Sequence, residues 1–214
     1  MSGNWTEEHW RDVCKMMAVA YRDRHTVCWF DGNADARIVG YADASYAGES
    51  SRGCYVLMYM GGFVEIGSTR LPQKYMSSTF AVEAKQAATG TVKVQGLQAL
   101  NLAIPGGERA SIPLLCGDNK GVHSVATKPG SLAQVVRHQV KDFALLRDCI
   151  ARLLIMYAWI STKNMVADIG TKFPTQAVYE KLVPILRGDQ VHADRPKMKR
   201  QPRERKRKRV RFNG

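Results

Sequence analysis

The chain has 214 residues, of which 45% are hydrophobic, and its formal net charge is +13. This length suffices for one domain of about 150 residues with a hydrophobic core and further segments at its ends. No apolar run approaches the roughly 18 residues that a membrane span needs, and the polar, acidic start "MSGNWTEEHW" is unlike a signal or transit peptide. We therefore expect a soluble, intracellular protein with no membrane contact.

The five cysteines argue against a disulfide framework and against a zinc site. They are odd in number, widely scattered and never spaced as a C-x-x-C pair. Free cysteines usually behave as small hydrophobic residues. We therefore expect all five to be reduced core residues, namely Cys14, Cys28, Cys54, Cys116 and Cys149.

The positive charge is concentrated near the C-terminal end. Residues 195 to 211 hold 11 of the 32 Lys and Arg residues and one acid, Glu204, so this segment carries +10 and the rest of the chain +3. It has too few apolar residues to fold alone, and we expect residues 189–214 to form a basic, disordered tail. The tail could bind nucleic acid, with Arg205, Lys206 and Arg207 in contact with phosphates, or it could serve as a nuclear import signal. A solvated end without a dedicated partner is the third interpretation.

The first half of the chain predicts a helix followed mainly by strands. Apolar residues recur at helical spacing over residues 5 to 22, and "TVCWF" and "RIVGYADA" read as two strands. The segment "GCYVLMYMGGFVEIGS" predicts a hairpin that turns at Gly61-Gly62, because glycine adopts the positive φ angles of a tight turn. A long helix follows over residues 80 to 102, with alanines on its packing side.

The second half is more helical. We expect strands in "SIPLLCGDN" and "LIMYAWIS", a short helix in "KGVHSVAT", and a long helix over residues 131 to 153 capped by Ser131. Two closing helices follow in "NMVADIGTK" and "TQAVYEKLVPILRG", the second interrupted near Pro184. Strands that give way to alternating strands and helices predict a mixed sheet with helices packed on it.

Four acids fall at the ends of these predicted elements. Asp43 lies at the end of a strand, Glu83 in the first turns of the long helix, and Asp118 and Asp168 just after apolar runs. Each acid alone is more often a cap or turn residue than a functional group. Together they could face one cleft.

The segments around these acids form a distinctive series, namely "GYADASYAG", "SSTFAVEAKQAA", "CGDNKGV", "VRH" and "ADIGTK". In their order and rough spacing they resemble the ribonuclease H domain of copia-type retrotransposon polyproteins, and the resemblance runs from about residue 5 to about residue 187. The resemblance implies an α/β, ribonuclease H-like fold with a five-stranded mixed sheet flanked by helices. It divides the chain into a thumb or connection-like helix and strand (1–34), the ribonuclease H-like domain (35–188) and the tail (189–214).

The same resemblance implies a catalytic metal site. The family's four catalytic acids fall on Asp43, Glu83, Asp118 and Asp168, which would bind two Mg²⁺ ions, with Mn²⁺ as an alternative, and hydrolyse the RNA strand of an RNA/DNA hybrid. Crowded carboxylates repel one another unless a cation compensates them, and hard oxygen ligands suit Mg²⁺ or Mn²⁺ rather than Zn²⁺. Two such ions can generate the hydroxide nucleophile and stabilise the charge on the phosphate.

Further residues are candidates for contact with the nucleic acid. Ser78 and Asn119 could touch a phosphate or a sugar, and a cap or turn role is the alternative for each. His138 matches the family's histidine after a basic residue, with a helix-surface position as the alternative. Lys172 completes "ADIGTK" and could face the phosphate backbone.

One departure from the family pattern bears directly on the site. "SSTFAVE" has one residue more between Thr and Glu than the family's "SSTEAE", and a slip of one residue rotates a helical side chain by about 100°. If the extra residue lies within the helix, Val82 faces the metals in place of Glu83. We expect it in the preceding loop, because Leu97 and Leu100 then match the family's downstream leucines.

Two functions remain open from the sequence. The first is an active ribonuclease H, which the four acids favour. The second is a domesticated, catalytically inactive module that binds nucleic acid or a ribonucleoprotein, which the tail favours because the family pattern lacks it. A reverse transcriptase or a ribonucleoprotein is a candidate partner, and the tail suggests the nucleus, with the cytoplasm as the alternative.

Overall fold

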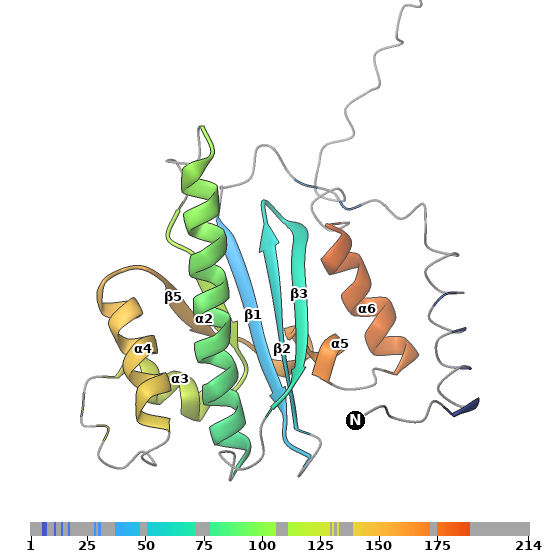
Figure 1. Cartoon of the computed structure of the whole chain (residues 1–214), viewed down its shortest axis with the longest axis horizontal. Helices are drawn as coiled ribbons and strands as arrows, with labels where there is room; N and C mark the ends of the chain where they lie inside the picture. The colour runs from blue at the N-terminus through green and yellow to red at the C-terminus, as the bar shows by residue number, and fades with distance from the viewer. Residues whose placement is uncertain are drawn as a thin grey trace, which may run out of the picture.

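The computed structural model describes most of the predicted ribonuclease H-like domain. It covers residues 37–47, 51–71, 78–105, 111–128, 139–171 and 175–188, with isolated positions outside these ranges. Figure 1 shows a sheet with α2 and α4 on one side and α5 and α6 on the other.

Five strands form one mixed sheet in the order β3-β2-β1-β4-β5. The strands are β1 (Ile38–Ser45), β2 (Arg52–Tyr59), β3 (Gly62–Arg70), β4 (Leu114–Gly117) and β5 (Met156–Trp159). The pairs β1·β2 and β2·β3 are antiparallel, whereas β1·β4 and β4·β5 are parallel. β1 is therefore the central strand, with the antiparallel β2 on one side and the parallel β4 on the other.

The predicted hairpin is present, but its turn lies one residue earlier than expected. Tyr59 pairs with Gly62, so the two loop residues are Met60 and Gly61, with φ angles of 49° and 76°. Positive φ at both central positions is typical of a type I′ turn. The prediction of Gly61-Gly62 was wrong because the strand register is set by which side chains are buried, and that register leaves Gly62 inside β3.

Helix α2 (Thr79–Ala103) confirms the predicted long helix. The Ser78 hydroxyl caps its start by accepting a hydrogen bond from the Ala81 amide at 3.3 Å. The helix ends at Ile104, which is extended and precedes Pro105, as expected because proline disfavours the helical conformation of the residue before it. Its buried face contains Ala84, Ala87 and Ala88, whose small side chains let the helix pack closely on β1.

Two apolar clusters occupy the two faces of the sheet. Tyr55 and Leu57 of β2 join the cluster under α2, α3 (Lys120–Thr127) and α4 (Val140–Ala151). Their neighbours in β2, Val56 and Met58, join the cluster under the segment that leads to α5 (Asp168–Thr171) and under α6 (Gln176–Arg187). Alternation along a strand sends successive side chains to opposite faces, so the sheet is covered on both sides.

The helix predicted over residues 131 to 153 is shorter in the structure. α4 begins at Val140, Leu132 lies in a bend, and the predicted cap Ser131 lies outside the described residues. The Arg147 guanidinium donates to the carbonyls of Val125, at 2.7 and 2.9 Å, and Gly130, at 2.6 Å. These bonds hold the connection from α3 against the side of α4, so that connection cannot continue the helix.

The predicted interruption at Pro184 was also wrong, because α6 continues through this residue. Proline removes one hydrogen bond, to the carbonyl of Glu180. Glu180 is exposed, so water can satisfy that carbonyl. Gly188, with a φ of 74°, ends the helix in the left-handed conformation.

The cysteine prediction was right for three residues and wrong for two. Cys54, Cys116 and Cys149 are buried, whereas Cys14 and Cys28 are exposed, and all five are free thiols. Cys14 and Cys28 belong to the first 34 residues, where only isolated positions are described.

The predictions for the two ends of the chain concern residues that lie largely outside the described ones. The predicted helix over residues 5 to 22 and the strand "TVCWF" have only isolated described positions, and Cys28 and Phe30 are not in a strand. The tail 189–214 lies wholly outside them. No helix in the described part of the chain has both the length and the apolar character of a membrane span.

The strand order and directions are those of a ribonuclease H-like fold. The predicted α/β architecture, a five-stranded mixed sheet flanked by helices, is therefore confirmed.

The packing of α2 on α4 predicts a large cost for removing one ring. Phe143 of α4 is fully buried, and its ring lies 5.5 Å from the ring of Phe80 in α2. Phe143→Ala should lower the free energy of unfolding by about 3–5 kcal/mol, because it leaves a cavity between the helices. Urea unfolding followed by circular dichroism measures this, and Val92→Ala, at a residue that is 55% exposed on α2, should change it by less than about 0.5 kcal/mol. Equal effects of the two substitutions would contradict this packing.

Candidate metal centre

The parallel pairing of β1 with β4 brings two of the predicted acids to the same edge of the sheet. Tyr41 of β1 is level with Cys116 of β4. Asp43 follows Tyr41 by two residues, and Asp118 follows Cys116 by two residues, in strands that run in the same direction. Asp43 is still within β1 and is 1% exposed, whereas Asp118 directly follows β4 and is half-buried.

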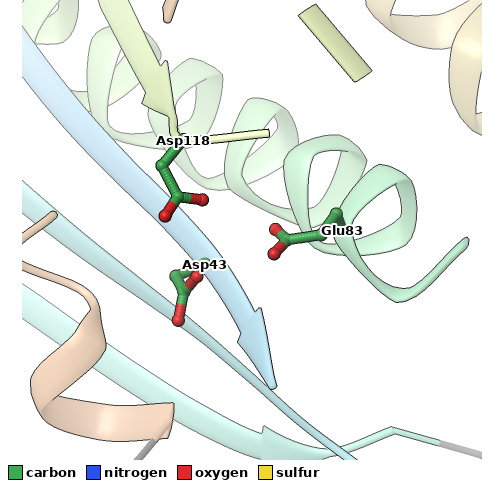
Figure 2. Close-up of side chains that lie close together, drawn as sticks. All are labelled: Asp43, Glu83 and Asp118. Carbon is green, nitrogen blue, oxygen red and sulfur yellow. The ribbon is translucent and has the colours of Figure 1, made fainter. Parts of the chain in front are cut away.

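Glu83 reaches these two acids from the first turns of α2. Its side chain is 8% exposed, and Figure 2 shows its carboxylate directed toward Asp43 and Asp118. Val82 instead packs with Ala44 and Leu71 in a separate apolar cluster. The structure thus resolves the question raised by the extra residue in "SSTFAVE", because Glu83 and not Val82 faces the other acids.

Asp43, Glu83 and Asp118 form one carboxylate cluster (Figure 2). Each contributes an oxygen, and these three oxygens lie within 4.8 Å of one another. The group has the number, spacing and donor type of a site for a divalent cation that prefers oxygen ligands. The carboxylate cluster is therefore the part of the described molecule that could hold a metal ion.

Asp168 is not one of the residues that the structure brings into the carboxylate cluster. It is the first residue of α5 and is half-buried. It begins the same four-residue helix that ends at Thr171, whose hydroxyl bonds to Asp43, so it lies near the cluster.

Two threonine hydroxyls hold two of the clustered acids. Thr171, the last residue of α5, donates a hydrogen bond to Oδ2 of Asp43, and both groups are buried. Thr162, in the short helical turn η5 (Thr162–Asn164), donates to Oδ2 of Asp118 at 2.7 Å. Each hydroxyl therefore holds one oxygen of its carboxylate in a fixed position.

β5 lines the side of the cluster next to Asp118. A side chain at Gly117 would collide with the Tyr157 hydroxyl, which explains the glycine that precedes the aspartate in "LCGDN". The indole N–H of Trp159 donates to the Asp118 carbonyl at 2.8 Å. Backbone and carboxylate of Asp118 are therefore both held by residues from β5 and η5.

The pKa values of nearby groups reflect burial and negative charge. Burial raises the pKa of Tyr157, and the charges of Glu83 and Asp118 raise it further. Burial is likewise the main cause that raises the pKa of the Cys54 thiol to about 12, with Asp43 acting in the same direction. Both groups are therefore neutral near pH 7 and add no charge to the cluster.

The predicted nucleic-acid contacts divide into helix caps and residues outside the described part. Ser78 caps α2, and the Asn119 side chain caps α3 by accepting from the Val122 amide at 3.1 Å. These caps are the alternative role that the sequence left open. The remaining candidates lie outside the described residues, namely His138, Lys172, Arg205, Lys206 and Arg207.

Sequence reasoning missed four residues that surround the cluster. Thr171 was noted only as part of "ADIGTK", and the other three gave no signal, because tyrosine, tryptophan and threonine are common in and after a strand. These residues are Tyr157, Trp159, Thr162 and Thr171.

Comparison with known proteins finds similar structures but no similar sequences. No protein-family model and no curated protein matches the chain. The N-terminal ribonuclease H domain of a Mycobacterium tuberculosis protein aligns with 69% of this chain and 99% of its own, at 12% identity and a TM-score of 0.49. Ribonuclease H1 of Halobacterium salinarum aligns with 63% of this chain and 93% of its own, at 14% identity and a TM-score of 0.46.

A retroviral enzyme is also among the similar structures. The foamy virus protease-reverse transcriptase, solved with an RNA/DNA hybrid, aligns over 68% of this chain and 20% of its own, at 13% identity and a TM-score of 0.49. At such identities and TM-scores these similarities carry no conclusion about activity.

The contact between Thr171 and Asp43 predicts a stability difference between two substitutions. Thr171→Val should lower the free energy of unfolding by about 1–3 kcal/mol, because it removes the hydroxyl that donates to a buried carboxylate oxygen of Asp43. Thr171→Ser keeps the hydroxyl and should cost clearly less. Urea unfolding at pH 7 without divalent metal measures both variants, and a valine variant as stable as the serine variant would show that the hydroxyl does not hold Asp43.

Proposed function

We propose that this chain is a metal-dependent endonuclease that hydrolyses the RNA strand of RNA/DNA hybrids, as the ribonuclease H of a retroelement does. The carboxylate cluster is the observation that carries the proposal. Three acids from β1, α2 and the end of β4 meet with their oxygens within 4.8 Å, and two of these acids are buried. The resemblance of the surrounding motifs to copia-type ribonuclease H domains supports the choice of substrate.

A divalent cation accounts for three acids so close together. Carboxylates at this distance repel one another, and burial adds to the cost of their charge, unless a cation compensates. The donors are all carboxylate oxygens, which suit Mg²⁺ or Mn²⁺ rather than a metal that prefers sulfur or nitrogen. The residues present therefore fit the ions that the resemblance implies.

Each acid has a proposed role. Asp43, Glu83 and Asp118 would hold the metal, and Asp168 is proposed as the fourth ligand of a two-ion site. When bound, the ions supply a hydroxide nucleophile and compensate the charge that develops on the phosphate. The hydroxyls of Thr162 and Thr171 keep two of the carboxylates in a fixed orientation for that task.

The substrate contacts proposed for the rest of the chain come from its charge and motifs. Ser78, Asn119, His138 and Lys172 would contact phosphates or sugars near the cut strand. The basic segment around Arg205, Lys206 and Arg207 would bind the backbone more generally or direct the chain to the nucleus. Residues 1–34 would form a thumb or connection-like helix and strand. The proposed partner is a reverse transcriptase or a ribonucleoprotein.

A second candidate function is an inactive module of the same fold that binds nucleic acid. The observation that favours it is the net charge of +10 in residues 195 to 211, which the copia-type pattern lacks. Such a chain would bind nucleic acid or a ribonucleoprotein through the region of the acids and through its tail, and it would cut no hybrid.

A cleavage assay distinguishes the two functions. The purified chain should cut the RNA strand of a labelled RNA/DNA hybrid when Mg²⁺ or Mn²⁺ is added and should stop when EDTA removes the ion. Asp118→Asn should reduce the rate by more than about 100-fold, because changes to groups that merely support a metal ligand already cost about 10–100-fold. Asp43→Asn and Glu83→Gln should act similarly, and Asp168→Asn tests the proposed fourth ligand.

The matched control for this assay is Asp148→Asn. Asp148 is an exposed acid of α4 whose ion-pair partner among the described residues is the exposed Arg152, so its loss should leave the rate unchanged. Binding of the hybrid without any cleavage would support the inactive module. Equal cleavage by the wild type and Asp118→Asn would rule out the proposed metal centre.

A further inference from the structure

Trp159 presents an exposed aromatic ring beside the carboxylate cluster. It is the last residue of β5 and pairs with Gly117 of β4, next to Asp118. Its indole N–H is bonded to the Asp118 carbonyl at 2.8 Å, yet 40% of the residue is exposed. The ring is therefore held in place on the surface at the edge of the proposed metal centre.

Lys120 places a positive charge over this ring. It is exposed at the first turn of α3, two residues after Asp118, and its Nζ lies 4.6 Å from the centroid of the Trp159 ring. Within the described ranges, Lys120 takes part in no ion pair. Its charge is thus available to an anion beside the carboxylate cluster.

A second lysine also lies over an aromatic ring, but its charge is paired with an acid. Lys93 lies 5.1 Å from the centroid of the Tyr55 ring, but Glu65 pairs with Lys93 at 3.5 Å and accepts a hydrogen bond from the Tyr55 hydroxyl at 2.5 Å. That lysine is compensated by an acid of the chain itself. Within the described ranges, no acid forms an ion pair with Lys120, although Trp159 is bonded to Asp118, a member of the carboxylate cluster that would repel a nucleic-acid backbone.

We propose that Trp159 and Lys120 form a nucleic-acid contact next to the metal centre, in which the ring packs on the sugar or base of the nucleotide flanking the cut and the ammonium group binds its phosphate. Exposed aromatic rings bind bases without sequence preference, and lysines beside them neutralise phosphates. This contact positions the strand against the acids and offsets their repulsion of the backbone. The inference rests on the proposed function, because it assumes a nucleic-acid substrate at the carboxylate cluster.

The test measures binding of a short RNA/DNA hybrid to the full chain in EDTA, where no metal-dependent cleavage occurs. Lys120→Gln should weaken binding about threefold to tenfold at 0.1 M salt and lower the slope of log K against log salt by about 1, since one phosphate contact is lost. Trp159→Leu should weaken binding about fivefold or more through loss of stacking. Trp159→Phe should retain most of the binding, because it keeps a ring and loses only the N–H group.

The matched control is Arg152→Gln. Arg152 is an exposed cation at the end of α4, before β5 begins, and so lies away from the strand ends that carry the acids. Its substitution should leave affinity and salt slope near the wild-type values. Thermal unfolding of each variant checks that it folds. If Trp159→Leu does not fold, Lys120→Gln and Trp159→Phe are still compared with the wild type and with Arg152→Gln.

The outcomes separate this inference from the proposed function. The inference is overturned if Lys120→Gln matches Arg152→Gln in affinity and salt slope, or if Trp159→Phe loses as much binding as Trp159→Leu, since the indole N–H would then be its whole role. Cleavage by the wild type together with either result would leave the proposed function standing. A wild-type chain that binds no hybrid would overturn both, whereas the predicted binding losses in a chain that cuts nothing would support the contact and contradict the nuclease.

Discussion

The carboxylates of Asp43, Glu83 and Asp118 repel one another, and the fold holds them together against that repulsion. Two come from the parallel strands β1 and β4, whose pairing places Asp43 and Asp118 at the same edge of the sheet. The third comes from α2, whose start at Thr79 turns Glu83 toward the sheet and Val82 into the core. The stability gained from burying the alanine face of α2 on β1 thus offsets the electrostatic cost of the cluster.

The C-terminal part of the domain fixes the acids that the N-terminal part supplies. Asp43 and Asp118 precede β5 in the chain, yet three side chains that bond to them, Trp159, Thr162 and Thr171, belong to β5 or follow it. The cluster therefore has its observed geometry only once β5, η5 and α5 are in place. This dependence ties the site to complete folding of the domain.

Much of the fold could be predicted because it depends on local patterns. Extended segments rich in apolar residues marked β1 and β2, the glycine pair marked the hairpin, and the alanine spacing marked α2. The errors arose where distant contacts decide the structure: the strand register moved the turn to Met60, and the Arg147 bonds to Val125 and Gly130 separated α4 from the preceding segment. α6 also passes Pro184, whose missing N–H would have bonded to the carbonyl of the exposed residue Glu180.

The candidate site could likewise be predicted from local patterns only in part. Its three acids were identified from motifs, but the choice between Val82 and Glu83 required the observed start of α2. Thr162 and Trp159 could not be found from the sequence, because their role depends on a partner more than 40 residues away.

The most direct test of the carboxylate cluster as a metal centre is titration of the metal-free chain with Mn²⁺, followed by electron paramagnetic resonance. If the three acids bind one ion together, the wild type should bind Mn²⁺ saturably, and Glu83→Gln should weaken this binding by at least about tenfold, while Asp148→Asn leaves it unchanged. Equal Mn²⁺ affinity of the wild type and Glu83→Gln would contradict a metal centre built from these acids.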